Sequence, residues 1–412
     1  MKRLAGLDLV RGVGILCVVF LHSATFHYAA ISEVNFDDPP LVITVIGFLL
    51  MWAGLFAILS SAAYAYSSAV RVGQGNLSPV QIAASYAKAG LLMLVLHYVY
   101  FLALAPKLLD VEGGNHQFSL LPGLIATGRF PPFYSDRVFY STALSMTAWN
   151  LLLIGPLVGW LLKRGRGARH AAPLLGGLGT LVVVLSLIRL PMYPVAAKSI
   201  EDGRWLAALI FGFLFNKNNP VLPYLGFGLF GSALGLALAG TERPRRALGW
   251  FALLGALWLA AGIVGLALLP DTMLEREVDL FWYFIVLFQL GLFLLLVVLA
   301  LYLFDYGPDK LCGVLNNALK PARRVGAVSL SIFMLETVFS QIGVRIADAL
   351  LPGWSLSINA CLLFGAINAL LWVGIVWVWS RAGFRYGMEW LSVRAYKWLR
   401  RPSDKMRMGE FL

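Results

Sequence analysis

The chain has 412 residues, of which 59% are hydrophobic and only 13% are charged, with a mean hydropathy of +0.78. These values lie far outside the range of soluble globular proteins, so they exclude a soluble fold and indicate an integral membrane protein. The formal net charge of +12 fits basic loops that face anionic lipid headgroups, and we expect no nucleic-acid partner.

Apolar runs of about 20 residues, which suffice to cross a bilayer as a helix, recur along the whole chain. The sequence therefore predicts an all-α integral membrane protein with about ten transmembrane helices. A further apolar stretch, 205–215, is too short to span the bilayer alone. The predicted spans are 9–28, 41–64, 87–106, 139–162, 172–190, 221–240, 247–269, 280–304, 325–350 and 356–380.

Lys and Arg residues concentrate in alternate loops, which is the bias of cytoplasmic segments. The clearest clusters are KRGRGAR (163–169) and RPRR (243–246), and the tail after residue 381 is also basic. Most acidic residues fall in the other loops. This pattern predicts that both termini are cytoplasmic. We expect one transmembrane domain over 1–385 and a basic amphipathic tail, 386–412, on the inner leaflet.

The first predicted span contains LDLVRGVGILCVVFLHS (7–23), in which Asp8 and Arg11 lie near one end and His22 near the other. Charges interrupt the apolar region and no small-residue cleavage site follows, so we interpret the segment as a retained helix rather than a signal peptide. Arg11 and His22 are eleven residues apart. On a helix their side chains point within about 20° of each other and lie about 16 Å apart along the axis. Asp8 lies one turn before Arg11 and can pair with it.

Each of these residues also has an ordinary explanation at a membrane interface. Asp8 and Arg11 could lie at the cytoplasmic surface, where long basic side chains extend to the headgroups, and His22 could lie near the outer surface. Their alignment on one helix face favours a functional role for all three. Ionisable residues inside a membrane cost free energy and therefore often mark functional sites.

This segment resembles the first helix of the acyltransferase-3 family of integral membrane acyltransferases, whose signature is an Arg and a His separated by ten residues, as Arg11 and His22 are. The LD..RG opening is also similar to that of the related heparan-glucosaminide N-acetyltransferase-like proteins. Two later segments, GAVSLSIFMLETVF (326–339) and NPVLPYLGFGLFGSALG (219–235), resemble further helix patterns of this group. Glu336 stands where the late-helix pattern often has His, and we expect no appended extracytoplasmic domain.

The resemblance implies transfer of an acyl group, in the first instance acetyl, from cytoplasmic acyl-CoA to a hydroxyl or amine of a glycan or lipid-linked acceptor. Acyl-CoA would be a donor substrate and not a permanently bound cofactor. Arg11, oriented by Asp8, would hold the donor at the cytoplasmic mouth. His22 would act as a general base or would form an acyl-His intermediate. Such a protein would work in a bacterial inner (plasma) membrane, surrounded by membrane lipids.

Four other polar residues are weaker candidates for acceptor binding. His27 lies about 140° around the helix from His22, so it faces elsewhere or emerges from the membrane. His97 is expected mainly as a hydrogen-bonded structural residue. Glu336 is the best remaining intramembrane acid and could orient His22, bind acceptor hydroxyls or pair with a neighbouring helix. Asn219 belongs to NKNNP (216–220), which is either a plain outer turn or a broken helix that lines a cavity.

The remaining features favour structural roles. Cys17, Cys312 and Cys361 show no spacing typical of a metal site or a disulfide framework, so we expect packing residues and no metal. Gly231 and Gly235 form a small-xxx-small pair that predicts helix packing. The outward loop 107–138, rich in Gly, Pro and aromatic residues, is either an ordered connector or a cover over a site.

Two other classes of function compete with the acyltransferase. A transporter or flippase for a small polar or lipid-linked solute fits many helices, a broken segment and a few buried charges. Paired interruptions in two halves of the chain, the sequence pattern of inverted-repeat carriers, are not evident. A purely structural or assembly protein would not need the aligned Asp8, Arg11 and His22.

Overall fold

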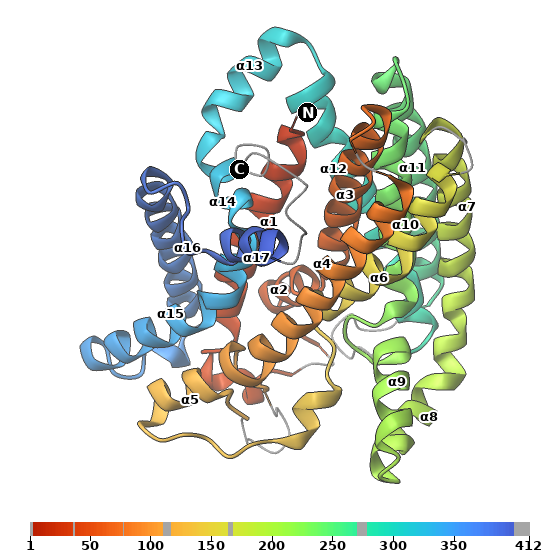
Figure 1. Cartoon of the computed structure of the whole chain (residues 1–412). Coiled ribbons are helices and arrows are strands. Elements are labelled where there is room, and N and C mark those ends of the chain that lie inside the picture. The colour runs from red at the N-terminus through yellow and green to blue at the C-terminus, as the bar shows by residue number, and fades with distance from the viewer. Residues whose placement is uncertain are drawn as a thin grey trace. The chain divides into compact units, whose positions relative to one another are not determined.

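The computed structural model describes residues 3–35, 38–76, 78–109, 117–163, 168–269 and 278–398. Within these ranges the chain is helical and forms no β-strand (Figure 1). Ten segments are helices long and apolar enough to cross a membrane. The predicted all-α, multi-pass membrane architecture is confirmed. Parts of the predicted basic loop 163–169, of the outward loop 107–138 and of the tail 386–412 lie outside the described residues.

Several spans consist of consecutive helices. The span Leu41–Gly73 is interrupted between α2 and α3, and His170–Glu201 is interrupted by a short 3-10 turn. The helices are α1 (Ala5–Thr25), α2 (Leu41–Leu49), α3 (Ala53–Gly73), α4 (Pro79–Val99), α5 (Leu120–Thr127), α6 (Ala143–Lys163), α7 (Ala168–Leu185), α8 (Arg189–Glu201), α9 (Trp205–Phe215), α10 (Val221–Ala239), α11 (Pro244–Leu268), α12 (Leu280–Leu301), α13 (Asp309–Ala318), α14 (Lys320–Ala327), α15 (Ser329–Leu350), α16 (Ile358–Arg381) and α17 (Met388–Trp398). Short 3-10 or π segments are η1 (Ala29–Glu33), η2 (Tyr100–Leu104), η3 (Ser135–Phe139), η4 (Ser186–Ile188), η5 (Tyr302–Tyr306) and η6 (Trp354–Leu356).

The predicted spans agree with these helices except at their boundaries. The fifth predicted span, 172–190, is too short, because the observed segment continues through α8 to Glu201. Arg189, Pro191 and Pro194 lower the apolar character there, so hydropathy alone ends the span too early. The short apolar stretch forms α9, which is separate from the ten candidate spans, as expected.

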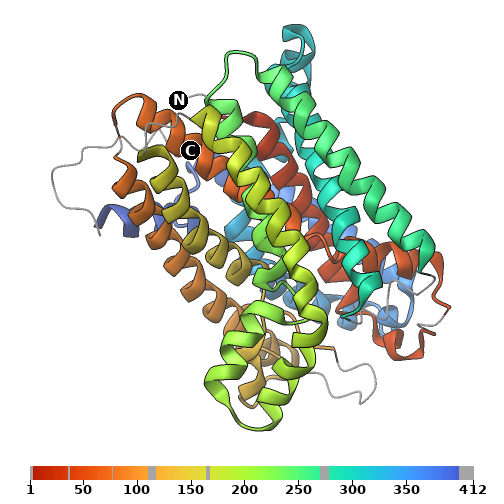
Figure 2. The same cartoon turned by 90° about the vertical axis from the view of Figure 1, so that its right-hand side faces the viewer.

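The first compact unit consists of the described residues of Met1–Leu7, Met51–His97 and Val138–Leu315. At its centre, α10 is buried between α3 and α7. A Cβ on Gly231 would lie 2.4 Å from Ile58 O, and one on Gly235 would lie 2.3 Å from Ala62 O. The predicted packing role of these two glycines is therefore confirmed. Beside this core, α11 runs along α12, as the green and teal helices of Figure 2 show.

The second compact unit consists of the described residues of Asp8–Leu50, Tyr98–Arg137 and Asn316–Leu412. In it α1 crosses α14 at very close range. A Cβ on Gly12 would lie 1.9 Å from Ala322 O, and one on Gly326 would lie 1.9 Å from Asp8 O. Only glycine at both positions permits this approach. The single domain predicted for 1–385 stays a prediction.

The tail helix α17 is anchored to the start of α15 in the same unit. The Glu389 carboxylate accepts hydrogen bonds from the N–H groups of Leu330 (2.7 Å) and Ser331 (3.3 Å), and from the Ser331 hydroxyl. The first N–H groups of a helix have no partner within it, and a carboxylate there also suits the helix dipole. Burial raises the pKa of the Glu389 carboxyl. This contact fixes the beginning of the helix that carries Glu336.

Candidate functional site

The first helix and the α14–α15 segment run in the same direction at a nearly constant register. Gly12 meets Gly326, and ten residues further along each segment His22 meets Glu336, a pair separated by 314 residues in sequence. His27 meets Ser340 at a separation of 313 residues. In a protein that crosses the membrane ten times, all odd-numbered spans run in the same direction. The parallel pairing of the first and ninth spans therefore agrees with the ten candidate spans.

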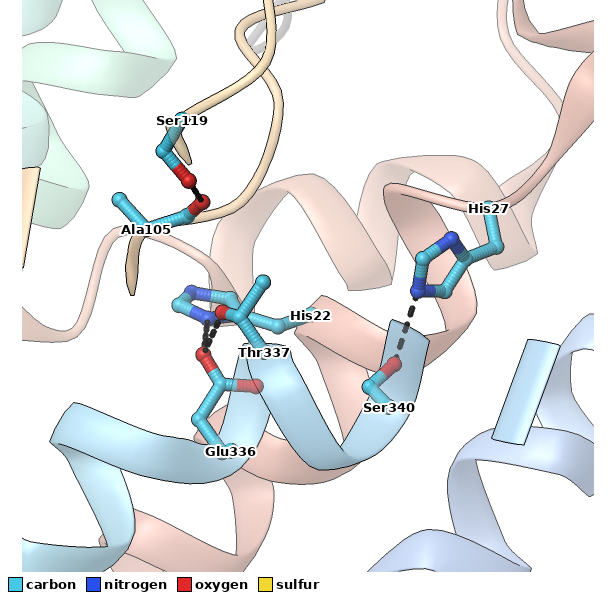
Figure 3. Close-up of polar contacts among 7 residues, drawn as sticks. All are labelled: His22, His27, Ala105, Ser119, Glu336, Thr337 and Ser340. Atoms are coloured by element: carbon cyan, nitrogen blue, oxygen red, sulfur yellow. Dashed lines mark hydrogen bonds and ion pairs between the residues drawn. The ribbon is translucent and has the colours of Figure 1, made fainter. Parts of the chain in front are cut away.

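The centre of this pairing is a hydrogen-bonded group of three side chains (Figure 3). The Nδ1–H of His22 donates to Glu336 Oε1 at 2.8 Å, and the Thr337 hydroxyl donates to the same oxygen at 2.8 Å. The side chain of Glu336 is fully buried, whereas that of His22 is 19% exposed. Two donors on one oxygen fix the rotation of the carboxylate. This carboxylate in turn fixes the plane of the imidazole.

This arrangement determines which nitrogen of His22 is available for chemistry. An ionised carboxylate can only accept, so Nδ1 carries the hydrogen, and in the neutral imidazole Nε2 holds the lone pair. Among the described residues, Nε2 has no hydrogen-bond partner. A neutral imidazole held in this tautomer can take a proton through Nε2 or attack an electrophile, and Glu336 would stabilise the imidazolium that results.

The second carboxylate oxygen of Glu336 is buried without a hydrogen bond in the part of the chain that the structure describes. Figure 3 shows it turned away from His22. A buried polar atom without a partner costs about 1–3 kcal/mol, so such atoms are rare in native structures and mark positions for water or a ligand.

Arg11 and Asp8 occupy the other end of the polar line on α1. Arg11 Nη1 lies 3.7 Å from Asp8 Oδ1, with side chains 23% and 9% exposed, so the predicted pairing across one turn is confirmed. Because α1 is unbroken from Ala5 to Thr25, the predicted separation of about 16 Å between Arg11 and His22 along the axis applies.

His27 lies beyond the end of α1, so the angular prediction of about 140°, which assumes a continuous helix, does not apply to it. Its Nε2 shares a hydrogen bond of 2.8 Å with Ser340 Oγ, one turn after Glu336 on α15 (Figure 3). Burial, with the nearby Lys107 ammonium, lowers the pKa of His27 to about 3. The imidazole is therefore neutral at ordinary pH.

His97 and Asn219 belong to the first unit, and each has local partners. His97 is buried, and its Nδ1 lies 2.9 Å from Thr142 Oγ1, which agrees with a structural histidine. The Asn219 carbonyl accepts a bond from the Ser141 hydroxyl at 2.9 Å. Nearby, the buried Arg189 donates to Asn216 O at 2.7 Å, which explains how the backbone break before α10 is satisfied. Arg189 was not singled out from the sequence.

The described part of the outward loop is an ordered connector of the second unit. The buried Arg137 guanidinium donates to Phe101 O and Gln117 O, each at 2.6 Å. Leu108 and Gln117 exchange two backbone bonds, and the Ser119 hydroxyl donates to Ala105 O at 2.5 Å (Figure 3). The segment that carries Lys107 is thereby held in place.

No group of three or more His, Cys, Asp or Glu side chains that could hold a metal ion lies in the described ranges. Cys17, Cys312 and Cys361 are free thiols. Thr337 and Lys107 were missed by sequence reasoning: a threonine next to an acid is unremarkable in a helix, and a lysine after a span resembles any interfacial lysine. No protein-family model matches the chain, and no curated protein is significantly similar to it.

Proposed function

We propose that the chain is a membrane acyltransferase of the acyltransferase-3 type. It moves an acyl group, acetyl in the simplest case, from cytoplasmic acyl-CoA to a hydroxyl or amine of a glycan or lipid-linked acceptor, in a bacterial inner membrane. The observation that carries this proposal is the hydrogen bond between His22 Nδ1 and the buried Glu336. The bond joins two of the segments that carry the resemblance, 7–23 and 326–339, which are far apart in sequence.

The direct mechanism uses His22 as a general base. Nε2 takes the proton of the acceptor hydroxyl while the oxygen attacks the thioester carbonyl. The C–S bond then breaks, and the departing thiolate of CoA receives the proton from the imidazolium. One thioester is consumed, one ester and one free thiol are formed, and Glu336 stabilises the charged imidazole between the two proton transfers.

In this proposal, Arg11 and Asp8 bind the donor substrate, acyl-CoA. A guanidinium held by a carboxylate is a suitable partner for the phosphates at the head of CoA, because it offers several donors in a rigid plane. The pantetheine arm of CoA is long and thin enough to extend along α1 toward His22, over the roughly 16 Å that separates the two side chains along the axis.

A variant mechanism forms an acyl-His intermediate. In it His22 Nε2 attacks the thioester, the C–S bond breaks, and CoA leaves as the thiolate. The acceptor hydroxyl then attacks the acyl-imidazolium, its proton passes to Nε2 as the N–C bond breaks, and the imidazolium gives that proton to the thiolate. A single turnover with labelled acetyl-CoA and no acceptor separates the two routes, because only the variant leaves label on His22.

The test of the proposed function is transfer of label from acetyl-CoA by purified protein in lipid nanodiscs, with and without glycan acceptors. We expect His22→Ala to reduce kcat by about 10²–10⁴-fold, the usual contribution of a general base. His170→Ala is the matched control, because His170 is exposed on α7. Transfer that is unchanged in His22→Ala would exclude the mechanism.

The transporter remains the second candidate because the spans Leu41–Gly73 and His170–Glu201 are interrupted. These two interruptions fall among the first five spans, whereas an inverted repeat would place them at equivalent positions in the two halves. The π segments η2 and η5, which end the third and eighth spans, are at equivalent positions but continue their helices without a break. Flux of a solute across proteoliposomes in the absence of acyl transfer would favour this candidate.

A further inference from the structure

We propose that one face of α16 is a binding groove for an anionic phospholipid. An acyl chain of the lipid lies along the helix, and the phosphate of the headgroup binds Arg381 at the C-terminal end of the helix. The proposal concerns an exposed surface of the second unit. It does not depend on the proposed acyl transfer.

The groove follows one side of α16 from Ile367 to Ala382 and has a volume of about 800 Å³. We call it the α16 groove. Its lining residues recur every three or four positions, so they share one helix face. All of them except the partly buried Trp379 are exposed. The side of α16 that packs against the rest of the unit is a different one, which carries the buried Gly365 and Trp372.

The chemistry of the lining favours a hydrocarbon chain as the occupant. The lining side chains are aliphatic or absent, apart from the indole of Trp379. The indole Nε1–H already donates to Arg385 O at 2.8 Å. A sugar or a peptide would therefore lose hydrogen bonds to water in this groove and gain none. The groove is about 22 Å long, which exceeds the roughly 15 Å that one leaflet of a hydrocarbon core of about 30 Å provides.

Gly374 creates space in the middle of the α16 groove. A Cβ at Gly374 would meet nothing within 4 Å, so helix packing in the described part of the chain does not require glycine there. Glycine inside a helix is less stable than alanine. The missing side chain leaves room between Leu370 and Val378, one turn away on either side, and an acyl chain can fill it.

Arg381 places a positive charge at the end of the same face. It follows Val378 by three residues and Gly374 by seven, so it continues the line of the groove. Its guanidinium lies over the ring of Trp377, with Cζ 3.8 Å from the ring centroid. Stacking on an aromatic ring leaves the guanidinium edge free to donate to phosphate oxygens. The groove therefore combines an apolar channel with a phosphate-binding group at one end.

The charge of the segment after α16 favours an anionic lipid over a second copy of the chain. Residues 381–412 contain eight Lys or Arg and three Asp or Glu, so a basic excess remains even if every acid is paired. Such segments attract the anionic headgroups of the cytoplasmic leaflet, where the loop charges place this end of α16. In a symmetric dimer the same surface meets itself, so docking through α16 would bring two basic ends together.

The experiment locates bound lipid by photolabelling. Phosphatidylglycerol and phosphatidylcholine with the same diazirine-bearing acyl chain are each added in trace amount to nanodiscs that contain the full-length protein, and the labelled peptides are mapped. We expect phosphatidylglycerol to label α16 about tenfold more than phosphatidylcholine does, which is the difference that one charge-assisted contact provides. Labelling of α11, which serves as the reference for bulk lipid, should differ less.

Two pairs of variants test the two parts of the groove. Arg381→Gln should remove the preference for phosphatidylglycerol, and Arg381→Lys should keep it. Arg204→Gln, at an exposed arginine between α8 and α9, is the control for the lost charge. Gly374→Leu should fill the groove and reduce labelling of α16 by both lipids. Gly177→Leu is its control, because a Cβ at Gly177 on α7 also meets nothing within 4 Å.

The outcomes separate the possible occupants. Equal labelling of α16 by the two lipids in wild-type protein, or an undiminished preference in Arg381→Gln, would overturn the proposal. An α16 without lipid label that instead cross-links to α16 of a second copy would assign the groove to a dimer. Unchanged unfolding midpoints in Arg381→Gln and Gly374→Leu, together with the expected losses of label, would support the lipid site.

Discussion

Glu336 determines what His22 can do. A carboxylate that is 1% exposed requires donors nearby, and His22 and Thr337 both provide them to the same oxygen. The bond from Nδ1 leaves Nε2 as the nitrogen available for the proposed chemistry. In that proposal Thr337 would act through Glu336, as a positioning residue.

At the same scale, His27 should not contribute to the pH dependence of transfer at ordinary pH. His27 has a pKa of about 3, so it gains a proton only as the pH falls to about that value and stays neutral above it. We expect His27→Asn to weaken acceptor binding while the pH–rate profile keeps its shape between about pH 5 and pH 8, the range in which ordinary histidines titrate. The measurement is kcat/KM for transfer across that range. A profile that loses an ionisation in His27→Asn would contradict the assignment.

Individual residues differ in how far the sequence could predict them. The Asp8–Arg11 pair and the alignment of Arg11 with His22 follow from helix geometry alone, because they lie on one continuous helix. The partner of His22 lies 314 residues away, so Glu336 could be suggested from its polarity but not assigned. The position of His27 could not be predicted, because it depends on where α1 ends.

At the scale of elements, the close crossing of α1 and α14 sets the register that brings His22 to Glu336. Backbones can approach this closely only where both helices carry glycine, and Gly12 and Gly326 supply the contact. The Met388 N–H and the Glu389 carboxylate then tie α17 to the Ser331 hydroxyl at the start of the next helix. The register of the site therefore depends on contacts between about one and three helical turns away from it.

Gly12→Ala should consequently affect both stability and activity. A Cβ there would lie 1.9 Å from Ala322 O, so the two helices must separate. We expect a loss of about 1–3 kcal/mol in the free energy of unfolding, typical of overpacking, with a fall in kcat. Gly176→Ala is the matched control, because a Cβ at Gly176 meets nothing within 4 Å. Thermal unfolding in detergent gives the comparison, and equal midpoints for the two variants would show that the crossing tolerates a methyl group.

At the scale of the whole molecule, hydropathy predicted the ten spans well, because a membrane constrains helix length strongly. The orientation predicted from the loop charges stays a prediction. The interruptions at α2–α3 and at η4 were not predicted, since apolar composition continues through both. The parallel pairing of the first and ninth spans depends on tertiary contacts and was also beyond prediction. It nevertheless agrees with the predicted topology, in which odd-numbered spans point outward.

The central claim is that His22 and Glu336 work as one catalytic unit, and a double-mutant cycle on acyl transfer tests it most directly. We predict that Glu336→Gln alone lowers kcat/KM, that His22→Ala lowers it further, and that the double variant is no slower than His22→Ala, because Glu336 acts only through the imidazole. The claim would be contradicted if the fold-loss of kcat/KM in the double variant equalled the product of the two single losses. A His22→Ala protein that transfers at the wild-type rate would also contradict it.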